Sequence, residues 1–242
     1  MSKIFATTSG KGGVGKSSVA TGLGLAFASL GNQVLLVDMD EGLRCLDLLL
    51  GVDGEVVLDL SDALGTPNVS DIAYPCKTEG LYLLPSPSKY GLVTKEALEE
   101  FCNKAKKIYD IIIFDFPAGI DFTLYEALPK ETVFLCVATP DPVSVRDASF
   151  VGAKLFELGL TARLIINRFN IKTHFKRKQK NIDGIIDASS IRLLGIVPES
   201  DEINLLSLRH RLKKNKKPFK AFVRIANRLL DKNIPLQKLK KI

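Results

Sequence analysis

Residues 10–18 read Gly10-Lys11-Gly12-Gly13-Val14-Gly15-Lys16-Ser17-Ser18. This run contains the spacing G-x-x-x-x-G-K-[S/T], which is the pattern of a phosphate-binding loop. The apolar residues 3–8 before it predict a buried strand, and residues 18–30 after it predict a helix. Strand, glycine-rich loop and helix in this order form the setting in which the pattern binds nucleotide phosphates. The stretch therefore predicts a nucleotide site inside an α/β domain.

Each part of this loop has a chemical reason. Glycines let successive backbone N–H groups turn toward one anion, and the N-terminus of the following helix adds its dipole. Lys16 supplies a charge for the terminal phosphates, and the Ser17 hydroxyl suits Mg²⁺. We predict that ATP is held by Gly10, Lys11, Gly12, Gly13, Val14, Gly15, Lys16, Ser17 and Ser18.

Lys11 is a second cation that an ordinary phosphate loop does not need, because Lys16 already serves the phosphates. A cation at this place can neutralise the charge that builds up in the transition state of phosphoryl transfer. The alternative is a solvated surface lysine.

The rest of the chain alternates between apolar runs and helical patterns, which predicts a doubly wound, mainly parallel sheet with helices on both faces. We expect one domain over residues 1–235 and a short basic tail over 236–242, and the segment from Val52 to Pro87 is the least regular. Predicted strands are 3–8, 33–38, 81–84, 111–115, 132–138, 162–167 and 193–197; predicted helices are 16–30, 94–107, 142–158, 201–209 and 218–230.

Composition narrows the class of protein. The 242 residues are 46% hydrophobic, enough for a sizeable core, yet no run approaches the ~20 apolar residues of a membrane span. The chain opens at once on a strand pattern, so we expect no signal or transit peptide and a cytoplasmic protein. The four cysteines are scattered without a C-x-x-C pair, which disfavours an iron–sulfur carrier or a zinc site.

The net charge of +7 is unevenly distributed. Basic residues gather in 174–180, in 209–217 and in 238–241. Such clusters suggest an anionic partner, either lipid head groups or nucleic acid, although solvated loops would give the same composition.

Two predicted strands end in carboxylates. In a doubly wound sheet the ligand lies at the carboxyl ends of the strands. Asp115 ends the run Ile111-Ile112-Ile113-Phe114 and is expected to hold the Ser17-bound Mg²⁺ through water. Asp38 and Asp40 follow another strand, and a carboxylate there can activate the attacking water. Turn formation or solvated loop acids are the alternatives.

A third strand ends in Asn167 and Arg168. The amide of Asn167 has a donor and an acceptor for the adenine edge, and Arg168 can stack on the base. Either residue could instead belong to an ordinary loop.

Several motifs together resemble the deviant phosphate-loop ATPases of the MinD/ParA family, in the SIMIBI class of P-loop NTPases. The motifs lie in order, and the resemblance covers about residues 2–236. Two segments within them, GLRCLD and PAGI, point to the MinD branch. The motifs are GKGGVGKSS (10–18), VDMDEGLRCLDLLLG (37–51), DFPAGI (115–120), VSVRD (143–147), INR (166–168) and GIVPES (195–200).

This resemblance implies an ATP-bound sandwich homodimer in which Lys11 reaches the phosphates of the other subunit. It implies that Asp40 activates the hydrolytic water. It also implies Mg²⁺ surrounded by Ser17, Asp38 and Asp115, and base contacts from Asn167, Arg168 and Pro198. The catalytic set is then Lys11, Lys16 and Asp40.

Three departures from the family pattern stand out. Phe116 occupies a position where the loop more often carries Ser or Thr, so one polar contact near the γ-phosphate is lost. Residues 208–217 contain a lysine run that the family does not explain. In the tail, Leu236, Leu239 and Ile242 recur among lysines, which suggests a miniature interfacial anchor that two tails of a dimer would strengthen. A frayed basic C-terminus that is packed or solvated is the alternative.

The leading functional hypothesis is an ATP-driven spatial switch in division-site placement. Its dimer would recruit a protein partner at the cytoplasmic membrane face, and a partner would stimulate hydrolysis. One alternative is a ParA-like ATPase that holds DNA nonspecifically through 176–180 and 209–217. The other is a placement factor for flagella or another organelle, or a scaffold that binds nucleotide without much turnover.

Overall fold

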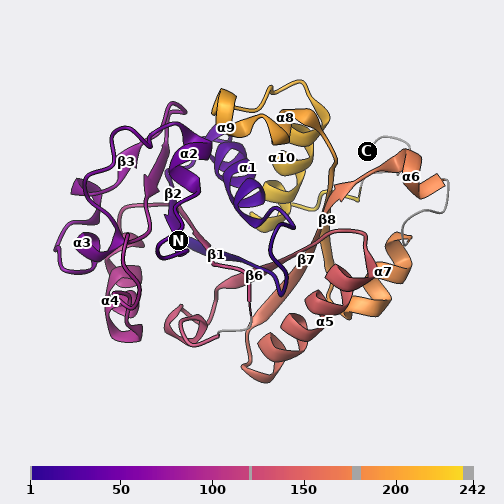
Figure 1. Ribbon diagram of the computed structural model, residues 1–242, viewed down its shortest axis with the longest axis horizontal. Coiled ribbons are helices and arrows are strands. Elements are labelled where there is room, and N and C mark those ends of the chain that lie inside the picture. Colours follow the sequence, from indigo (N-terminus) through magenta and orange to yellow (C-terminus); the bar gives the residue numbers. More distant parts are fainter. Residues whose placement is uncertain (1, 120–121, 176–180, 237–242) are drawn as a thin grey trace.

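The computed structural model describes residues 2–119, 122–175 and 181–236, without the side chains of residues 174 and 175. One eight-stranded sheet runs through the centre of these residues, as Figure 1 shows. Its strands are β1 (Lys3–Thr8), β2 (Val34–Asp38), β3 (Tyr74–Pro75), β4 (Leu81–Leu84), β5 (Ile111–Asp115), β6 (Val133–Ala138), β7 (Thr161–Phe169) and β8 (Leu193–Pro198).

The strand order is β3-β4-β2-β5-β1-β6-β7-β8. Every pairing is parallel except that of β3 with β4. The central strands β2 and β5 are buried along their whole length, which is why their sequences are continuous apolar runs rather than alternating ones. Both end in an aspartate, and the phosphate loop follows β1, which pairs with β5.

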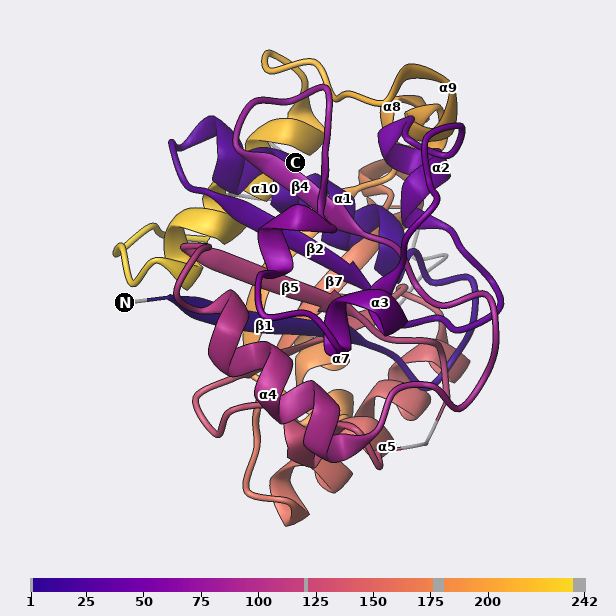
Figure 2. The ribbon, with the colours of Figure 1, turned by 90° about the vertical axis from the view of Figure 1, so that its left-hand side faces the viewer.

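Helices cover both faces of the sheet, and Figure 2 shows the two layers above and below the strands. On one face lie α1 (Lys16–Ser29), α2 (Leu46–Leu50), α8 (Asp201–Asn204), α9 (Leu206–Arg209) and α10 (Lys217–Leu229). On the other lie α3 (Leu60–Leu64), α4 (Lys95–Ala105), α5 (Pro142–Glu157), α6 (Ile171–Phe175), α7 (Ile182–Ser189) and the short 3₁₀ turns η1 (Val69–Asp71) and η2 (Tyr125–Ala127).

The central helix α1 is fixed by close packing against α10. A Cβ on Gly22 would stand 2.3 Å from the ring of Phe222, so the missing side chain is what lets the two helices approach. Phe222 is fully buried in the core beneath α1. This contact sets the direction of α1, and with it the place of the phosphate loop at the helix N-terminus.

The predicted α/β class is confirmed, and all seven predicted strands are present within one or two residues. One helix prediction was wrong, because residues 201–209 form two short helices interrupted at Leu205. The sequence also did not predict α2, α3, α6, α7 or β3. These elements span only two to eight residues, too few for an apolar period to show.

Candidate nucleotide-binding and hydrolysis site

The phosphate loop occupies the turn between β1 and α1, and its glycines are required by geometry. Gly13 and Gly15 have φ angles of 76° and 92°, in the left-handed region that favours glycine. A Cβ on Gly15 would lie 2.4 Å from the Asn167 amide nitrogen, and one on Gly10 would lie 3.0 Å from Asp147. The loop therefore packs tightly against its neighbours while its backbone turns toward the start of α1.

Asn167 anchors this loop. Its Nδ2 donates to the Val14 carbonyl at 2.8 Å, and the residue is 2% exposed. Its Oδ1 is buried and has no hydrogen-bond partner among the described residues. Asn167 lies within β7, which runs to Phe169 and is irregular here, and Arg168 adopts a φ of 53°. The unsatisfied acceptor is compatible with the predicted adenine contact, which stays a prediction.

A pocket of about 420 Å³ opens beside the start of α1. Four residues that were predicted to hold the nucleotide line it together: Ser18, Asn167, Arg168 and Pro198. The other lining residues come from α2, from the segment that follows β8 and from α8. They are Leu49, Glu199, Ser200, Ile203 and Asn204. The sequence did not predict Leu49 as a lining residue, because α2 spans only five residues.

Asp38 and Asp115 end neighbouring strands in direct register. Both are buried, at 1% and 3% exposure. Asp38 accepts hydrogen bonds from the backbone N–H groups of Asp40 at 3.0 Å and of Cys45 and Leu46 at 3.2 Å. It thereby holds the first turn of α2.

Asp115 is held by two hydroxyls. The Thr7 hydroxyl of β1 donates to its Oδ1, and the Ser17 side chain is its second hydrogen-bond partner. The same Ser17 side chain also interacts with the Cys45 thiol. The sequence did not predict a role for Thr7 or Cys45, although Cys45 lies within the motif at residues 37–51.

Two adjacent buried carboxylates disfavour their own ionisation. Burial, followed by the charge of Asp115, raises the pKa of Asp38 to about 7. Burial also raises the pKa of Asp115, against the opposing effects of Ser17, Thr7 and Lys16. A divalent cation at Ser17 would relieve this repulsion. Two carboxylates and a hydroxyl match the sparse protein ligand set that Mg²⁺ uses beside phosphates. Among the described residues, no group of three or more His, Cys, Asp or Glu is placed so that these side chains alone could hold a metal ion.

Lys16 and Asp40 complete this charged centre. Burial lowers the pKa of Lys16, while the carboxylates of Asp115 and Asp40 favour its charged form. Burial raises the pKa of Asp40, and Lys16 opposes that shift. The Lys16 ammonium therefore lies close enough to both carboxylates to feel their charge. This position is compatible with its predicted role in binding the terminal phosphates.

Lys11 behaves differently from Lys16. Its side chain is 44% exposed, and its Nζ lies 3.6 Å from Oδ1 of Asp141. Asp141 is the N-cap of α5 and accepts a hydrogen bond from the Ser144 N–H at 3.0 Å. The second lysine of the loop is thus directed toward the surface beside α5.

Comparison with known proteins identifies the family. The family described as CobQ/CobB/MinD/ParA nucleotide binding domain matches residues 5–213. The chain belongs to the MinD/ParA family. The septum site-determining protein MinD of Bacillus subtilis is 34% identical over 99% of this chain and 93% of its own length.

Two solved structures of MinD proteins extend the comparison. In the MinC:MinD cell division protein complex of Aquifex aeolicus, a chain is 28% identical, with a TM-score of 0.86 over 98% of this chain and 99% of its own. The MinD of Pyrococcus horikoshii, complexed with Mg-ADP, is also 28% identical, with a TM-score of 0.82 over 97% of this chain and 100% of its own. These likenesses establish a MinD-like P-loop NTPase fold and a nucleotide-binding family.

Phe116, the departure from the MinD/ParA pattern, is 4% exposed and packs into an aromatic cluster. Its ring centroid lies 4.6 Å from that of Tyr125, whose hydroxyl is 2.6 Å from the Thr8 hydroxyl. Further along the same loop, the Gly119 N–H donates to the Ser9 carbonyl at 3.1 Å. Apolar packing therefore fixes the start of the loop that follows β5. A Ser or Thr at position 116 would have made this part of the loop more polar.

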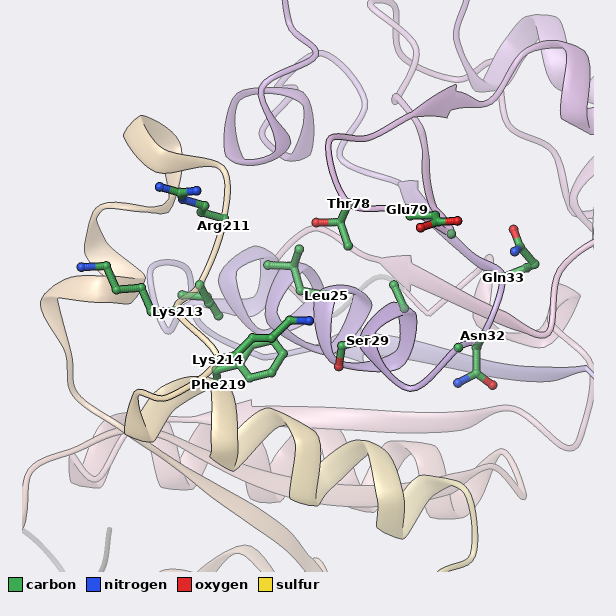
Figure 3. A pocket seen from close by; sticks show the side chains of 14 residues that line it. Leu25, Ser29, Asn32, Gln33, Thr78, Glu79, Arg211, Lys213, Lys214 and Phe219 are labelled. Atoms are coloured by element: carbon green, nitrogen blue, oxygen red, sulfur yellow. The ribbon is translucent and has the colours of Figure 1, made fainter.

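A second cavity, of about 720 Å³, lies near the other end of α1 (Figure 3). Figure 3 shows Lys214 reaching toward Leu25 and Ser29, while Arg211 and Lys213 point away from them. None of the predicted nucleotide-site residues lines this cavity. It is separated from the phosphate loop by the length of α1, about 20 Å for 14 residues.

The basic segments that are predicted to meet an anionic partner are described only in part. Residues 176–180 and 237–242 lie outside the described residues, so the tail beyond Leu236 is not placed. In the described basic segment, Arg209 and Lys213 both approach Glu202, at 3.1 and 4.0 Å. Among the described residues no helix combines the length and apolar character that a bilayer span requires.

Proposed function

We propose that this chain is a MinD-like ATPase that acts as a switch in division-site placement. ATP binding would close a homodimer that recruits a protein partner at the membrane, and hydrolysis would release it. The observation that carries the proposal is the convergence of Lys16, Ser17, Asp38, Asp40 and Asp115 at the carboxyl ends of β1, β2 and β5. The MinC:MinD complex of Aquifex aeolicus supports a protein partner by analogy.

The proposed chemistry follows from the charges at this centre. The backbone of the phosphate loop and Lys16 bind the phosphates. Mg²⁺, held by Ser17, Asp38 and Asp115, supplies positive charge that offsets the charge of the phosphates. Asp40 orients the attacking water and accepts its proton as the bond from water to the γ-phosphorus forms and the bond from the γ-phosphorus to the β–γ bridging oxygen breaks, which releases ADP. The burial that raises the pKa of Asp40 makes its carboxylate a better proton acceptor than a solvated one.

Lys11 is the proposed link between nucleotide state and assembly. Lys16 already occupies the charged centre of its own subunit, whereas Lys11 is exposed and forms a surface ion pair with the partly exposed Asp141. Surface pairs of this kind contribute about 0–1 kcal/mol, so exchange for a phosphate of a second subunit costs little. Closure of the dimer would therefore depend on the γ-phosphate.

The surface that the dimer seeks is proposed to be anionic lipid. A short basic tail with apolar residues binds weakly alone, while two tails in a dimer gain by avidity. The test is sedimentation with anionic vesicles in ATP and in ADP, beside vesicles of neutral lipid. Pelleting with anionic vesicles in ATP alone supports the proposal, and a chain truncated before Leu236 should then stay in the supernatant. If the protein does not pellet with anionic vesicles in an ATP-dependent way, the membrane role is contradicted.

Nonspecific DNA binding is the second candidate. The exposed residues Arg211, Lys214 and Lys216 favour it, while the pairing of Arg209 and Lys213 with Glu202 reduces the available charge. Binding through phosphate contacts weakens steeply with salt. A gel shift with a random duplex at two salt concentrations separates the two roles. A salt-sensitive, ATP-dependent shift without vesicle pelleting would favour the DNA-binding switch.

A further inference from the structure

The loop that carries Asp40, residues 39–45, is held by its backbone on both sides of that residue. The Asp40 N–H donates to Oδ1 of Asp38 at 3.0 Å, and its carbonyl accepts from the Ser86 hydroxyl at 3.0 Å. Two residues further on, the Gly42 N–H donates to the Pro87 carbonyl at 2.9 Å. These hydrogen bonds restrain the backbone on both sides of Asp40 and so limit the positions that its carboxylate can take.

Ser86 lies in a stiff stretch that follows β4. Pro85 and Pro87 flank it, and each proline ring locks its own φ angle. Ser86 is fully buried, and the Pro85 carbonyl accepts from the Leu60 N–H at 2.9 Å. The hydroxyl that reaches Asp40 therefore comes from a backbone that is itself fixed to α3.

Glu41, the neighbour of Asp40, makes a second connection to the same segment. Its carboxylate accepts hydrogen bonds from three successive backbone N–H groups, those of Gly91 at 2.7 Å and of Leu92 and Val93 at 3.2 Å. Gly91 has a φ of 76°, which turns the chain so that the donors converge. Hydrogen bonds to an ionised acceptor are about twice as strong as neutral ones.

We propose that Glu41 and Ser86 are positioning residues for Asp40, an inference that rests on the proposed role of Asp40 in hydrolysis. Neither side chain lies among the groups assigned to phosphate or Mg²⁺. Both instead fix the peptide groups beside Asp40 to residues 85–93. In-line attack needs the water within a narrow range of positions, and a misplacement of about 1 Å costs on the order of 100-fold in rate.

The test compares Glu41→Gln and Ser86→Ala with the parent chain in single-turnover ATP hydrolysis. Each variant should lower the rate of the chemical step about tenfold, with ATP affinity within about twofold of the parent. Glu55→Gln is the matched control, an exposed glutamate in a neighbouring loop, and should hydrolyse ATP at the parent rate. An equal loss in the control would overturn the proposal.

Hydrogen exchange supplies a readout that does not depend on activity. In Glu41→Gln, the amides of residues 91–93 should lose protection while those of β2 keep it. Lost protection combined with the parent rate of hydrolysis would overturn the positioning role. Unchanged protection would also overturn it, since the hydrogen bonds would then not hold the loop.

An Asp40→Ala background separates this inference from the proposed function. If Glu41 acts through Asp40, Glu41→Gln should not lower the residual rate of Asp40→Ala any further. A further loss there overturns the positioning role alone. Parent-like hydrolysis by Asp40→Ala contradicts instead the catalytic role of Asp40, whatever Glu41→Gln does.

Discussion

The phosphate loop and the Asp40 loop begin at the same edge of the sheet, yet they are held in different ways. The phosphate loop depends on its own backbone turns, with φ angles of 76° at Gly13 and 92° at Gly15, and on the hydrogen bond from Asn167 to the Val14 carbonyl. The Asp40 loop is fixed by the Ser86 hydroxyl, the Pro87 carbonyl and the backbone N–H groups of residues 91–93, about fifty residues further along the chain.

This difference teaches which part of the site is encoded locally. A loop defined by its own torsions must show glycine at fixed spacings, so it can be recognised in any chain that carries the motif. A loop held from outside depends on which segment lies beside it, and that is decided only when β4 pairs with β2. Variants in the two loops should therefore fail in different ways.

The largest effect is expected from Gly15→Ala. The added Cβ would lie 2.4 Å from the Asn167 amide, at a φ of 92° that alanine rarely adopts. The loop must distort, and we expect ATP affinity to fall by on the order of 100-fold or more. Calorimetric titration of ATP measures this. Gly54→Ala is the control, because a Cβ there meets nothing within 4 Å and the residue lies outside the phosphate loop; equal losses in both would show that packing against Asn167 is not the cause.

Lys11→Ala sharpens the comparison within the phosphate loop itself. Because Lys16 serves the phosphates of its own subunit, the variant should bind ATP within about threefold of the parent affinity. It should no longer form a dimer when ATP is bound. Analytical ultracentrifugation in ATP reports the assembly, with exposed Lys107→Ala as the control. Normal ATP-dependent dimers of Lys11→Ala would remove the proposed role in trans.

Arg44→Met tests the support of the Asp40 loop at its far end. The guanidinium donates to the Ser86 carbonyl at 2.9 Å and to the Asp59 carboxylate at 3.1 Å. Its loss should lower stability by about 1–3 kcal/mol and hydrolysis severalfold, with ATP affinity little changed. Urea unfolding and single-turnover assays measure both. A loss of ATP affinity as large as that of Gly15→Ala would contradict the division between the two loops.

The smallest effect concerns the pH dependence of the protein without nucleotide or metal. The pKa of Asp38 is raised from 3.8 to about 7 in the fold, so this group favours folding at low pH and loses that contribution as pH rises through 7. Asp38→Asn has no charge to bury. Its melting temperature should exceed that of the parent by several degrees at pH 8 and by less at pH 5.

Melting curves in EDTA check this pH dependence, with exposed Asp53→Asn as the control. If the difference in melting temperature between Asp38→Asn and the parent is the same at both pH values, the fold does not raise the pKa of Asp38.

The fold and the phosphate loop could be predicted because their signals are local. Continuous apolar runs such as 111–115 are produced by burial on both faces, and Asp115 follows such a run directly. The catalytic interpretation of Asp40 and the ligand roles of Asp38 came from resemblance to a family, and they remain predictions.

Other parts of the site could not be found in the sequence. Thr7 and Cys45 contact the predicted ligands only through strand pairing and the start of α2. The carboxylate of Glu41 looks like any loop acid until residues 91–93 are brought beside it. The helix pattern over 201–209 suggested one element, whereas the chain is interrupted at Leu205.

The most direct test of the central claim is the mass of Asp40→Ala in solution, measured by light scattering with ATP and Mg²⁺ and again with ADP. A switch that closes on ATP and opens by hydrolysis predicts a stable dimer of about 53 kDa in ATP, twice the 26.5 kDa of one chain, and a monomer in ADP. A monomer in both nucleotides, or a dimer in both, would contradict the account.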